Sequence, residues 1–316
     1  MGEVNKKFIG LSQFKAPFNF ELAGKHFHLC FDCGQDFSIQ FVDGEVVQYA
    51  EKGQPYVWDT YQCLKGDDTT YLVLVEPAGH DGKLHYNLIL DLEQRLCTVV
   101  TLEEGYDPEY PRLIRVTPYF GAIKLPGREL PKIRHHLDDR MVGKHIVWHY
   151  NPGFSIEHIY HTPICIRADL ERPEVMGDVK ARLEAERHSD DPEIRANAEK
   201  QIAEFERRRQ YYPFYEEECF HIWIKENLNL MCFLEENMNR LDPERYGGGG
   251  GILLLQDIER VTDVGTCFSG GEYYMCTAFG DENSDLKELD TKPSPYDWSK
   301  FDAMPSIYWD IPKNEE

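Results

Sequence analysis

The amino-acid sequence predicts a mainly β protein, built as two lipocalin-like antiparallel barrels in tandem, because its two halves repeat each other. LAGKHFHLCFDCG, from Leu22, resembles MVGKHIVWHYNPG, from Met141, at an offset of 119 residues. LVLVEPAG, with Glu76, resembles MCFLEEN, with Glu235, at an offset of 159. A third pair, LILDLEQRL and LLLQDIERV, follows at an offset of 166. Since the order is the same in both halves, each half is predicted to form one copy of the same small module.

Short runs of β-branched and aromatic residues, bounded by Gly, Asp or Pro, predict about eight strands in the first module. Seven of these runs cover residues 25–31, 37–41, 46–49, 58–64, 70–76, 84–91 and 96–102. Asp43 and Gly44 predict a tight hairpin turn between the second and third runs. Short strands with tight turns and no interleaved helix favour an antiparallel barrel.

A proline-rich segment separates the two modules. Five prolines fall between residues 106 and 131, which makes poor helix or central strand, so this segment is predicted to be a linker. We therefore place a first barrel with its linker in residues 1–130. Residues 131–316 hold the second barrel, a helical insert at 171–210 and an acidic C-terminal tail.

The second module has its own strand-like runs, at residues 145–150, 154–160, 219–224, 228–234 and 252–258. Between them, half of the residues from 171 to 210 are charged, and apolar residues recur at helical spacing. Asp191 and Pro192 are typical of a helix start, so two helices packed on the outside of the barrel are expected. The five glycines at 247–251 predict a hairpin loop without a phosphate-binding pattern.

Composition excludes several classes of partner. The net charge of −22 repels phosphate backbones and anionic lipids, so neither nucleic acid nor a membrane surface is expected to bind.

No run of 18 apolar residues predicts a transmembrane helix, and the N-terminus lacks the apolar core of a secretory signal. Nine scattered cysteines favour a reduced, cytoplasmic protein, with Cys30 and Cys33 as structural thiols rather than a redox or zinc pair. A homo-oligomer is compatible with this composition.

Candidate acid–base residues lie on two strands of the second module. Alternation places Trp148 and Tyr150 on one strand face and His149 on the other. Glu235 ends an apolar face, where loss of solvation raises the pKa of a carboxyl group toward neutrality. A general acid or base needs such a pKa. The alternative is that Tyr150 and Glu235 are rim residues that make ordinary hydrogen bonds.

Six histidines between residues 135 and 161 raise the question of a metal site. His145 and His149 share a strand face but lie about 13 Å apart along it, at roughly 3.3 Å per residue, too far for one ion. His158 and His161 are an odd number of residues apart, so on one strand their side chains would point to opposite faces. We therefore predict neither a metal nor another cofactor, although a single histidine such as His149 or His158 could act within a pocket.

VGKHIVWHYNPGFSIEHIY resembles the opening strands of the phenolic acid decarboxylases, which are small lipocalin-like barrels. In that family, two ring positions are tyrosines that engage the phenol and carboxylate of a cinnamic-type acid. The resemblance places these positions at Trp148 and Tyr150. In the first half, Leu29 and Phe31 stand there instead.

The glutamate of that family lies in a Glu-Pro-x-Gly segment. VEPAG at Glu76 matches the segment well, and LEEN at Glu235 matches the position without the proline. The family's arginine has no counterpart in either half. A lipocalin-like module repeated in a chain of this length is also similar to proteins described as molybdenum cofactor biosynthesis protein F (MoaF)-like.

These resemblances imply a cofactor-independent lyase, a decarboxylase that acts on an aromatic or phenolic small molecule inside a barrel. Tyr150 and Glu235 are the expected catalytic residues. The expected ligand-binding residues are Trp148, Phe154, His149, His158 and Glu76. The alternative is a non-catalytic small-molecule-binding or pathway accessory protein of the MoaF-like type, because a barrel can hold a ligand without chemistry.

Overall fold

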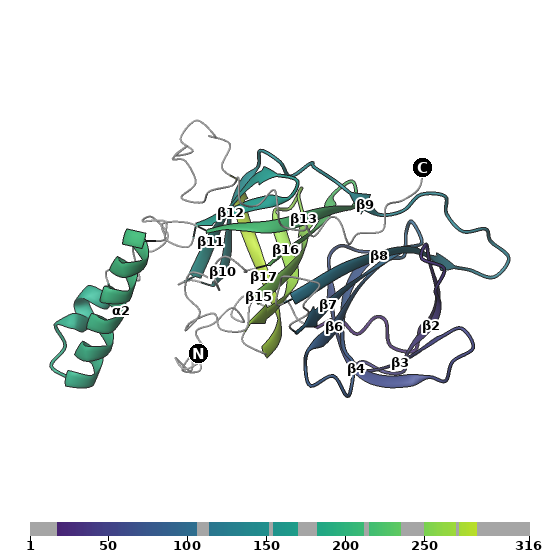
Figure 1. The fold of residues 1–316 in the computed structure, drawn as a ribbon, viewed down its shortest axis with the longest axis horizontal. Coiled ribbons are helices and arrows are strands. Elements are labelled where there is room, and N and C mark those ends of the chain that lie inside the picture. The colour runs from purple at the N-terminus through teal and green to yellow at the C-terminus, as the bar shows by residue number, and fades with distance from the viewer. Residues whose placement is uncertain are drawn as a thin grey trace.

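The structure, a computed structural model, contains two antiparallel β-barrels that lie side by side (Figure 1). It describes residues 18–105, 114–151, 154–169, 182–211, 215–234, 250–269 and 272–282. The predicted fold class, two tandem barrels with a helical insertion in the second, is confirmed. Within the described residues, no helix is long and apolar enough to span a membrane.

The first barrel is closed by pairing of its first strand with its last. Its strands are β1 (His26–Phe31), β2 (Asp36–Phe41), β3 (Val46–Glu51), β4 (Val57–Lys65), β5 (Thr70–Glu76), β6 (Leu84–Asp91), β7 (Leu96–Glu104) and β8 (Ile114–Lys124). The bounds of β1 to β7 agree with the predicted runs to within two residues at each end.

Strand β8 corrects the prediction that residues 106–131 form a linker. It contains Pro118, which pairs with Val100 of β7. However, β8 pairs with β1 only from Gly121 onward. One side of β8 is therefore unpaired at Pro118, where the missing N–H of proline is tolerated as it is on an edge strand.

The second barrel repeats this arrangement. Its strands are β10 (His145–Asn151), β11 (Phe154–Thr162), β12 (Cys165–Asp169), β13 (Tyr215–Lys225), β14 (Leu228–Leu234), β15 (Gly250–Asp257), β16 (Thr262–Ser269) and β17 (Glu272–Glu282). Pairing of β12 with β13 joins the two ends of this ring, and the short β9 (His136–Leu137) adds to β13.

Matching turns confirm the first and third sequence repeats. Gly24 and Gly143, 119 residues apart, both have positive φ, at 76° and 88°. The Gly24 N–H donates to the carbonyl of Phe41, and the Gly143 N–H donates to the carbonyl of Tyr160. The two acceptors are also 119 residues apart. Arg95 and Val261, 166 residues apart, have φ values of 58° and 50° after equivalent aspartate-capped turns.

The second repeat is displaced by one residue from its predicted alignment. Thr70 pairs with Asp91 in the first barrel, and Leu228 pairs with Asp257 in the second. The equivalent strands β5 and β14 therefore differ by 158 residues rather than 159. At this offset, Glu76 corresponds to Leu234 and not to Glu235. A shift of one residue also moves each side chain to the opposite face of the strand. Glu235 itself lies outside the described residues.

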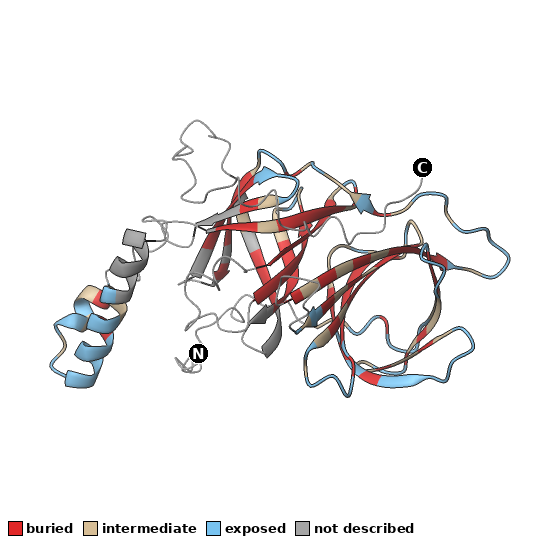
Figure 2. Cartoon of the chain, viewed as in Figure 1, coloured by how far each residue is buried: buried red, intermediate tan, exposed pale blue. Residues whose placement is uncertain are grey.

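The insert contains helix at residues 182–187 and in α2 (Pro192–Tyr211). The predicted start is confirmed, because the Asp191 carboxylate accepts a hydrogen bond of 2.9 Å from the Glu193 N–H. In Figure 1, α2 projects away from both barrels, so the expected packing of this helix on the barrel surface is wrong. Most residues of this helix are charged or polar, so its exposed side is stable in contact with water (Figure 2).

Each barrel has an apolar cluster in its interior, and a third apolar cluster joins the two barrels. This shared cluster contains Leu72 and Leu74 of β5 together with Leu230 of β14 and Leu255 of β15. Strands such as β14 and β15 are consequently buried on both faces (Figure 2). Apolar burial on this scale is the main force that makes the two barrels one packed unit.

Close packing also corrects the prediction of a loop at residues 247–251. Gly250 and Gly251 belong to β15, while residues 247–249 lie outside the described part of the chain. A Cβ atom on Gly251 would lie 3.1 Å from Leu102 of the first barrel. Glycine at this position therefore allows the two barrels to approach each other.

Candidate functional site

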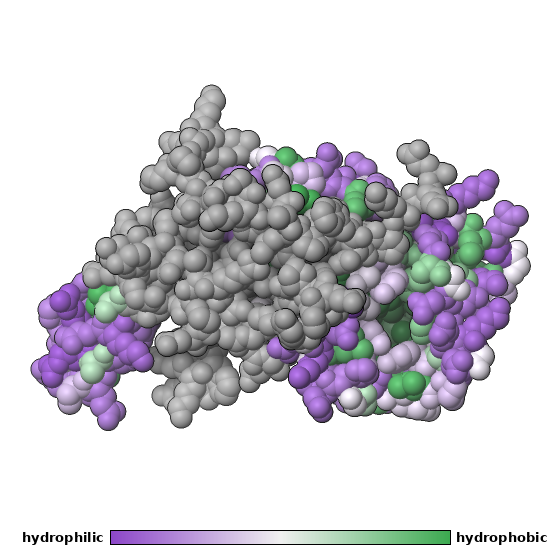
Figure 3. Space-filling model, viewed as in Figure 1, coloured by the Kyte–Doolittle hydropathy of each residue, from purple (hydrophilic) through white to green (hydrophobic). Residues whose placement is uncertain are grey.

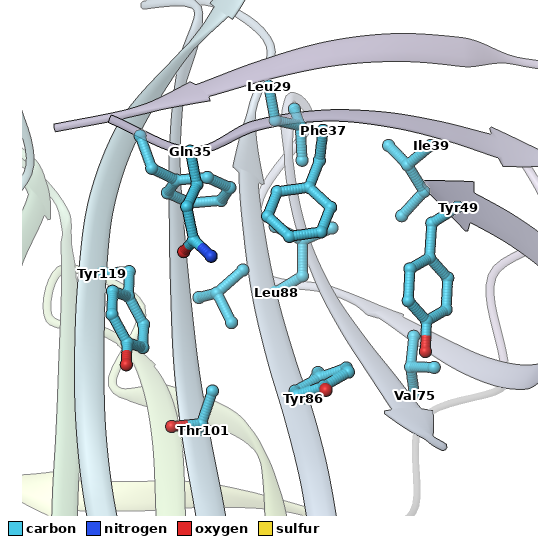
Figure 4. Close-up of a pocket in the computed structure, with 12 residues that line it drawn as sticks. Leu29, Gln35, Phe37, Ile39, Tyr49, Val75, Tyr86, Leu88, Thr101 and Tyr119 are labelled. Atoms are coloured by element: carbon cyan, nitrogen blue, oxygen red, sulfur yellow. The ribbon is translucent and has the colours of Figure 1, made fainter. Parts of the chain in front are cut away.

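The interior of the first barrel contains a cavity of about 260 Å3. Most of its wall is aliphatic or phenylalanine side chains that point inward from β1, β2, β5, β6 and β7. The polar side chains in the wall are Gln35, Tyr49, Tyr86, Thr101 and Tyr119. Figure 4 shows the three tyrosines reaching into the same space from β3, β6 and β8. Figure 3 shows hydrophobic residues deep in this end of the barrel within a more hydrophilic rim.

Tyr49 is held by a buried carboxylate. Its hydroxyl donates a hydrogen bond of 2.7 Å to Oδ2 of Asp59, and Oδ1 of Asp59 accepts one of 2.8 Å from the Ala78 N–H. Burial, together with the hydrogen bond and charge of Asp59, raises the pKa of Tyr49. The phenol therefore stays neutral and directs its proton to Asp59, which leaves the lone pairs of its oxygen for a ligand that donates.

The hydroxyls of Tyr86 and Tyr119 make no hydrogen bond to another described residue. The Tyr86 ring lies edge-on to Tyr49, with centroids 6.2 Å apart. Burial, with the charges of Asp59 and Glu103, raises the pKa of Tyr86. Both phenols can thus donate a proton to a ligand, whereas Tyr49 can only accept one.

Among the described residues, the cavity wall carries no ionisable group other than its phenols. None of its described lining residues is Lys, Arg, His, Asp or Glu, and the nearby Asp59 carboxyl group already accepts hydrogen bonds from Tyr49 and the Ala78 N–H. A carboxylate inside the cavity would lose its hydration without gaining an opposite charge, which is costly. The electrostatics therefore favour a neutral ligand.

In the second barrel, Trp148 and Tyr150 point inward as predicted, and both are buried. The Tyr150 hydroxyl donates to Oδ2 of Asp263 at 3.4 Å. Burial raises the pKa of Asp263 to about 7. The Trp148 indole N–H donates to the hydroxyl of Tyr160 at 3.2 Å.

Sequence reasoning missed Asp263 and Tyr160. The signal for Asp263 was an acidic residue within the run TDVGTCF, in which small and apolar residues otherwise predict a strand. Gln256, also missed, donates to the Tyr160 hydroxyl at 2.8 Å. These three side chains form a polar layer inside the second barrel.

Of the other predicted residues, His158 lies in the second barrel beside Tyr160, with ring centroids 6.0 Å apart. His158 is fully buried against Phe233, with ring centroids 5.6 Å apart, and burial lowers its pKa to about 3. Glu76 is exposed at the end of β5 and does not line the cavity, because its parity directs it to the outer face of the barrel. The side chains of His149 and Phe154, and all of Glu235, lie outside the described part of the protein.

Residues 4–103 match the family model described as the MoaF N-terminal domain. Over this segment, the first barrel is similar to the MoaF N-terminal domain. This confirms the resemblance to the MoaF-like proteins over that segment, while the resemblance to phenolic acid decarboxylases finds no support among the comparisons. The MoaF-like segment includes the cavity residues from Leu29 to Thr101, and Tyr119 lies beyond it.

Other comparisons add little to this relationship. No curated protein matches the chain. Among solved structures, a Burkholderia vietnamiensis protein provisionally described as a beta-lactamase aligns with a TM-score of 0.26 and 18% identity. The alignment covers 35% of this chain and 97% of that one.

Proposed function

We propose that the first barrel binds a small, neutral aromatic molecule that carries a hydroxyl group, such as a phenol. The observation that supports this function is the cavity of about 260 Å3, whose apolar wall, within the described part of the chain, carries three tyrosines and no charged residue. The volume lies just below the usual range for ligand sites, roughly 300–1,000 Å3, which suits a one- or two-ring compound.

The phenols of the cavity define how such a ligand would be held. A ligand hydroxyl can donate its proton to Tyr49, whose own proton is engaged by Asp59. The same ligand oxygen can accept a proton from Tyr86 or Tyr119. Each hydrogen bond contributes about 0.5–1.5 kcal/mol net, and burial of the apolar rings supplies the larger part of the affinity. No step of this function requires catalysis or a cofactor.

Calorimetric titration with 2-naphthol and 2-naphthoate tests the proposal, because the two compounds share a ring system and differ in charge at pH 7. We expect 2-naphthol to bind with one-to-one stoichiometry and 2-naphthoate at least about tenfold more weakly, since tenfold corresponds to only about 1.4 kcal/mol. Equal or tighter binding of the carboxylate would refute a neutral-ligand site.

A second candidate, the cofactor-independent lyase, is favoured by the Tyr150–Asp263 pair in the second barrel. A carboxyl group with a pKa of about 7 can act as general acid or base near neutral pH, the role expected from the sequence for Glu235. Loss of ultraviolet absorbance from a panel of hydroxycinnamates, with release of CO2, would support this reaction. Asp263→Asn should then reduce turnover by about 100- to 10,000-fold.

A cytoplasmic location remains part of the proposal. All nine cysteines are free, and Cys267 and Cys276 remain thiols although their sulfurs lie 3.4 Å apart. Unbonded thiols this close are compatible with a reducing compartment. Non-reducing mass spectrometry of protein isolated from its native cells under thiol-trapping conditions should find nine trapped thiols, and an internal disulfide would contradict it.

A further inference from the structure

The outer wall of the first barrel carries a cluster of His28, Cys30 and Asp36. His28 and Cys30 are two residues apart on β1, so they share the face opposite to the inward-pointing Leu29. Asp36 of β2 is the direct cross-strand partner of Cys30. One potential ligand atom from each of the three residues lies within 4.8 Å of the others, and His28 Nε2 is 4.0 Å from Asp36 Oδ2.

These three donors match the requirements of a tetrahedral metal ion. Zinc bonds of about 2.0–2.3 Å place neighbouring tetrahedral ligand atoms roughly 3.3–3.8 Å apart. Side-chain rotations that shorten the present separations by about 1 Å would bring the nitrogen, sulfur and oxygen atoms to that spacing. A thiolate with an imidazole selects zinc or a similar transition metal over magnesium and calcium, which prefer oxygen ligands only.

The charges around the cluster determine how tightly a cation binds. Lys52 Nζ lies 3.8 Å from Asp36 Oδ2, and Lys124 of β8 is the cross-strand partner of His28. Lys52 therefore competes with a cation for the Asp36 carboxylate. Its side chain is 77% exposed, so it can leave the carboxylate without breaking the barrel packing.

We propose that His28, Cys30 and Asp36 bind a zinc-like transition-metal ion on the outer wall of the first barrel. Binding replaces the proton on the Cys30 sulfur with a metal–sulfur bond and releases that proton to solvent. Three protein ligands leave a fourth coordination position open to water or to an exogenous ligand. The site does not use the histidines at 135–161, on which the sequence prediction of no metal was based.

Titration of metal-free protein, purified without a histidine tag, with Co2+ and then Zn2+ tests this site. We expect one equivalent of Co2+ to give a thiolate-to-cobalt charge-transfer band, which one equivalent of Zn2+ abolishes. Cys30→Ser should remove the band. Cys33→Ser is the matched control, because Cys33 is exposed in the following turn and outside the cluster, and it should leave the band unchanged.

Two further variants separate a metal site from a folding defect at the buried Cys30. His28→Gln changes a side chain that is 39% exposed, so the fold should persist while Co2+ affinity falls at least tenfold. Lys52→Gln should instead increase the affinity, because it removes the cation that competes for Asp36. Absence of a saturable band in the wild type, or a band that survives Cys30→Ser or disappears in Cys33→Ser, would overturn the proposal.

Discussion

Leu29 and Trp148 occupy equivalent positions in the two barrels. They lie 119 residues apart on β1 and β10, where Leu29 pairs with Ile123 and Trp148 pairs with Gly280. Leu29 lines the cavity of the first barrel, whereas Trp148 is 1% exposed in the core of the second. A Cβ atom on Gly280 would lie 3.0 Å from the Trp148 ring, so the glycine makes room for the indole. This exchange of side-chain volume helps to explain why the first barrel has space for a ligand.

The double variant Leu29→Trp/Ile123→Ala should fill the cavity and abolish binding of 2-naphthol. The alanine provides part of the space that Gly280 gives Trp148, which limits the overpacking cost of about 1–3 kcal/mol. Calorimetry measures the affinity and urea unfolding measures the stability. Ile123→Ala alone is the control and should still bind, and retained binding by the double variant would place the ligand elsewhere.

Tyr86→Phe and Tyr119→Phe should each weaken 2-naphthol binding by about 2- to 12-fold. This range corresponds to the 0.5–1.5 kcal/mol that one hydrogen bond contributes. Tyr56→Phe provides the comparison, because Tyr56 bonds to Ser38 on the outside of the barrel, and its affinity should match the wild type. If all three variants bound like the wild type, the cavity phenols would have no part in recognition.

The pKa of Asp263 makes the stability of the protein depend on pH in a specific direction. Its folded pKa of about 7 lies above the ordinary value of 3.8, so between these pH values the folded state holds a proton that the unfolded state has lost. The contribution of Asp263 to the free energy of unfolding therefore decreases as the pH rises from about 4 to about 7. Asp263→Asn, which cannot ionise, should gain up to about 1.4 kcal/mol of unfolding free energy relative to wild type for each pH unit in that window.

Urea unfolding at pH 5, 6, 7 and 8 measures this gain, which should level off above pH 7. Asp43→Asn is a suitable control, because backbone N–H groups of Glu45 and Val46 lower the pKa of Asp43. The difference in unfolding free energy between Asp43→Asn and the wild type should stay constant over the same pH range. A constant difference for Asp263→Asn as well would show that Asp263 is ionised throughout.

Lys225→Met should destabilise the whole protein by about 3–5 kcal/mol, the usual cost of breaking a buried ion pair. Lys225 of the second barrel lies 3.0 Å from Asp67 and 3.7 Å from Asp91, both in the first. Lys65→Met is the control, since its pair with Glu21 lies near the surface, where solvent screens the charges, so this variant should lose far less stability.

Scanning calorimetry should show one transition for the wild type and for both lysine variants, because the apolar cluster between the barrels remains intact. Two separate transitions in the wild type would mean that the barrels unfold independently. In that case the ion pairs of Lys225 would join two self-sufficient domains.

Much of the fold was predictable from the sequence because local patterns determine it. Strand alternation and turn residues located β1 to β7, and the similarity of LILDLEQRL to LLLQDIERV revealed the repeat that contains Asp91 and Asp257. The one-residue error at Glu76 arose because β5 and β14 are buried on both faces, so their sequences do not alternate. Strand β8 was missed because Pro118 is acceptable only where one edge is unpaired, a tertiary property.

The candidate site was less predictable than the fold. Tyr150 and Trp148 were correctly placed inside a barrel, but Tyr49, Tyr86 and Tyr119 were not recognised as a group. They come from three strands separated by more than 30 residues, and only barrel closure brings them together. The absence of charge in the cavity wall is likewise a property of the assembled barrel.

Anomalous diffraction from crystals grown with 6-bromo-2-naphthol is the most direct test of the neutral-ligand site in the first barrel. The bromine locates the ligand independently of the protein electron density. The account predicts one dominant bromine peak inside the ring of β1 to β8, with the naphthol oxygen within hydrogen-bond distance of Tyr49. A dominant peak inside the second barrel, or on the outer surface, would contradict it.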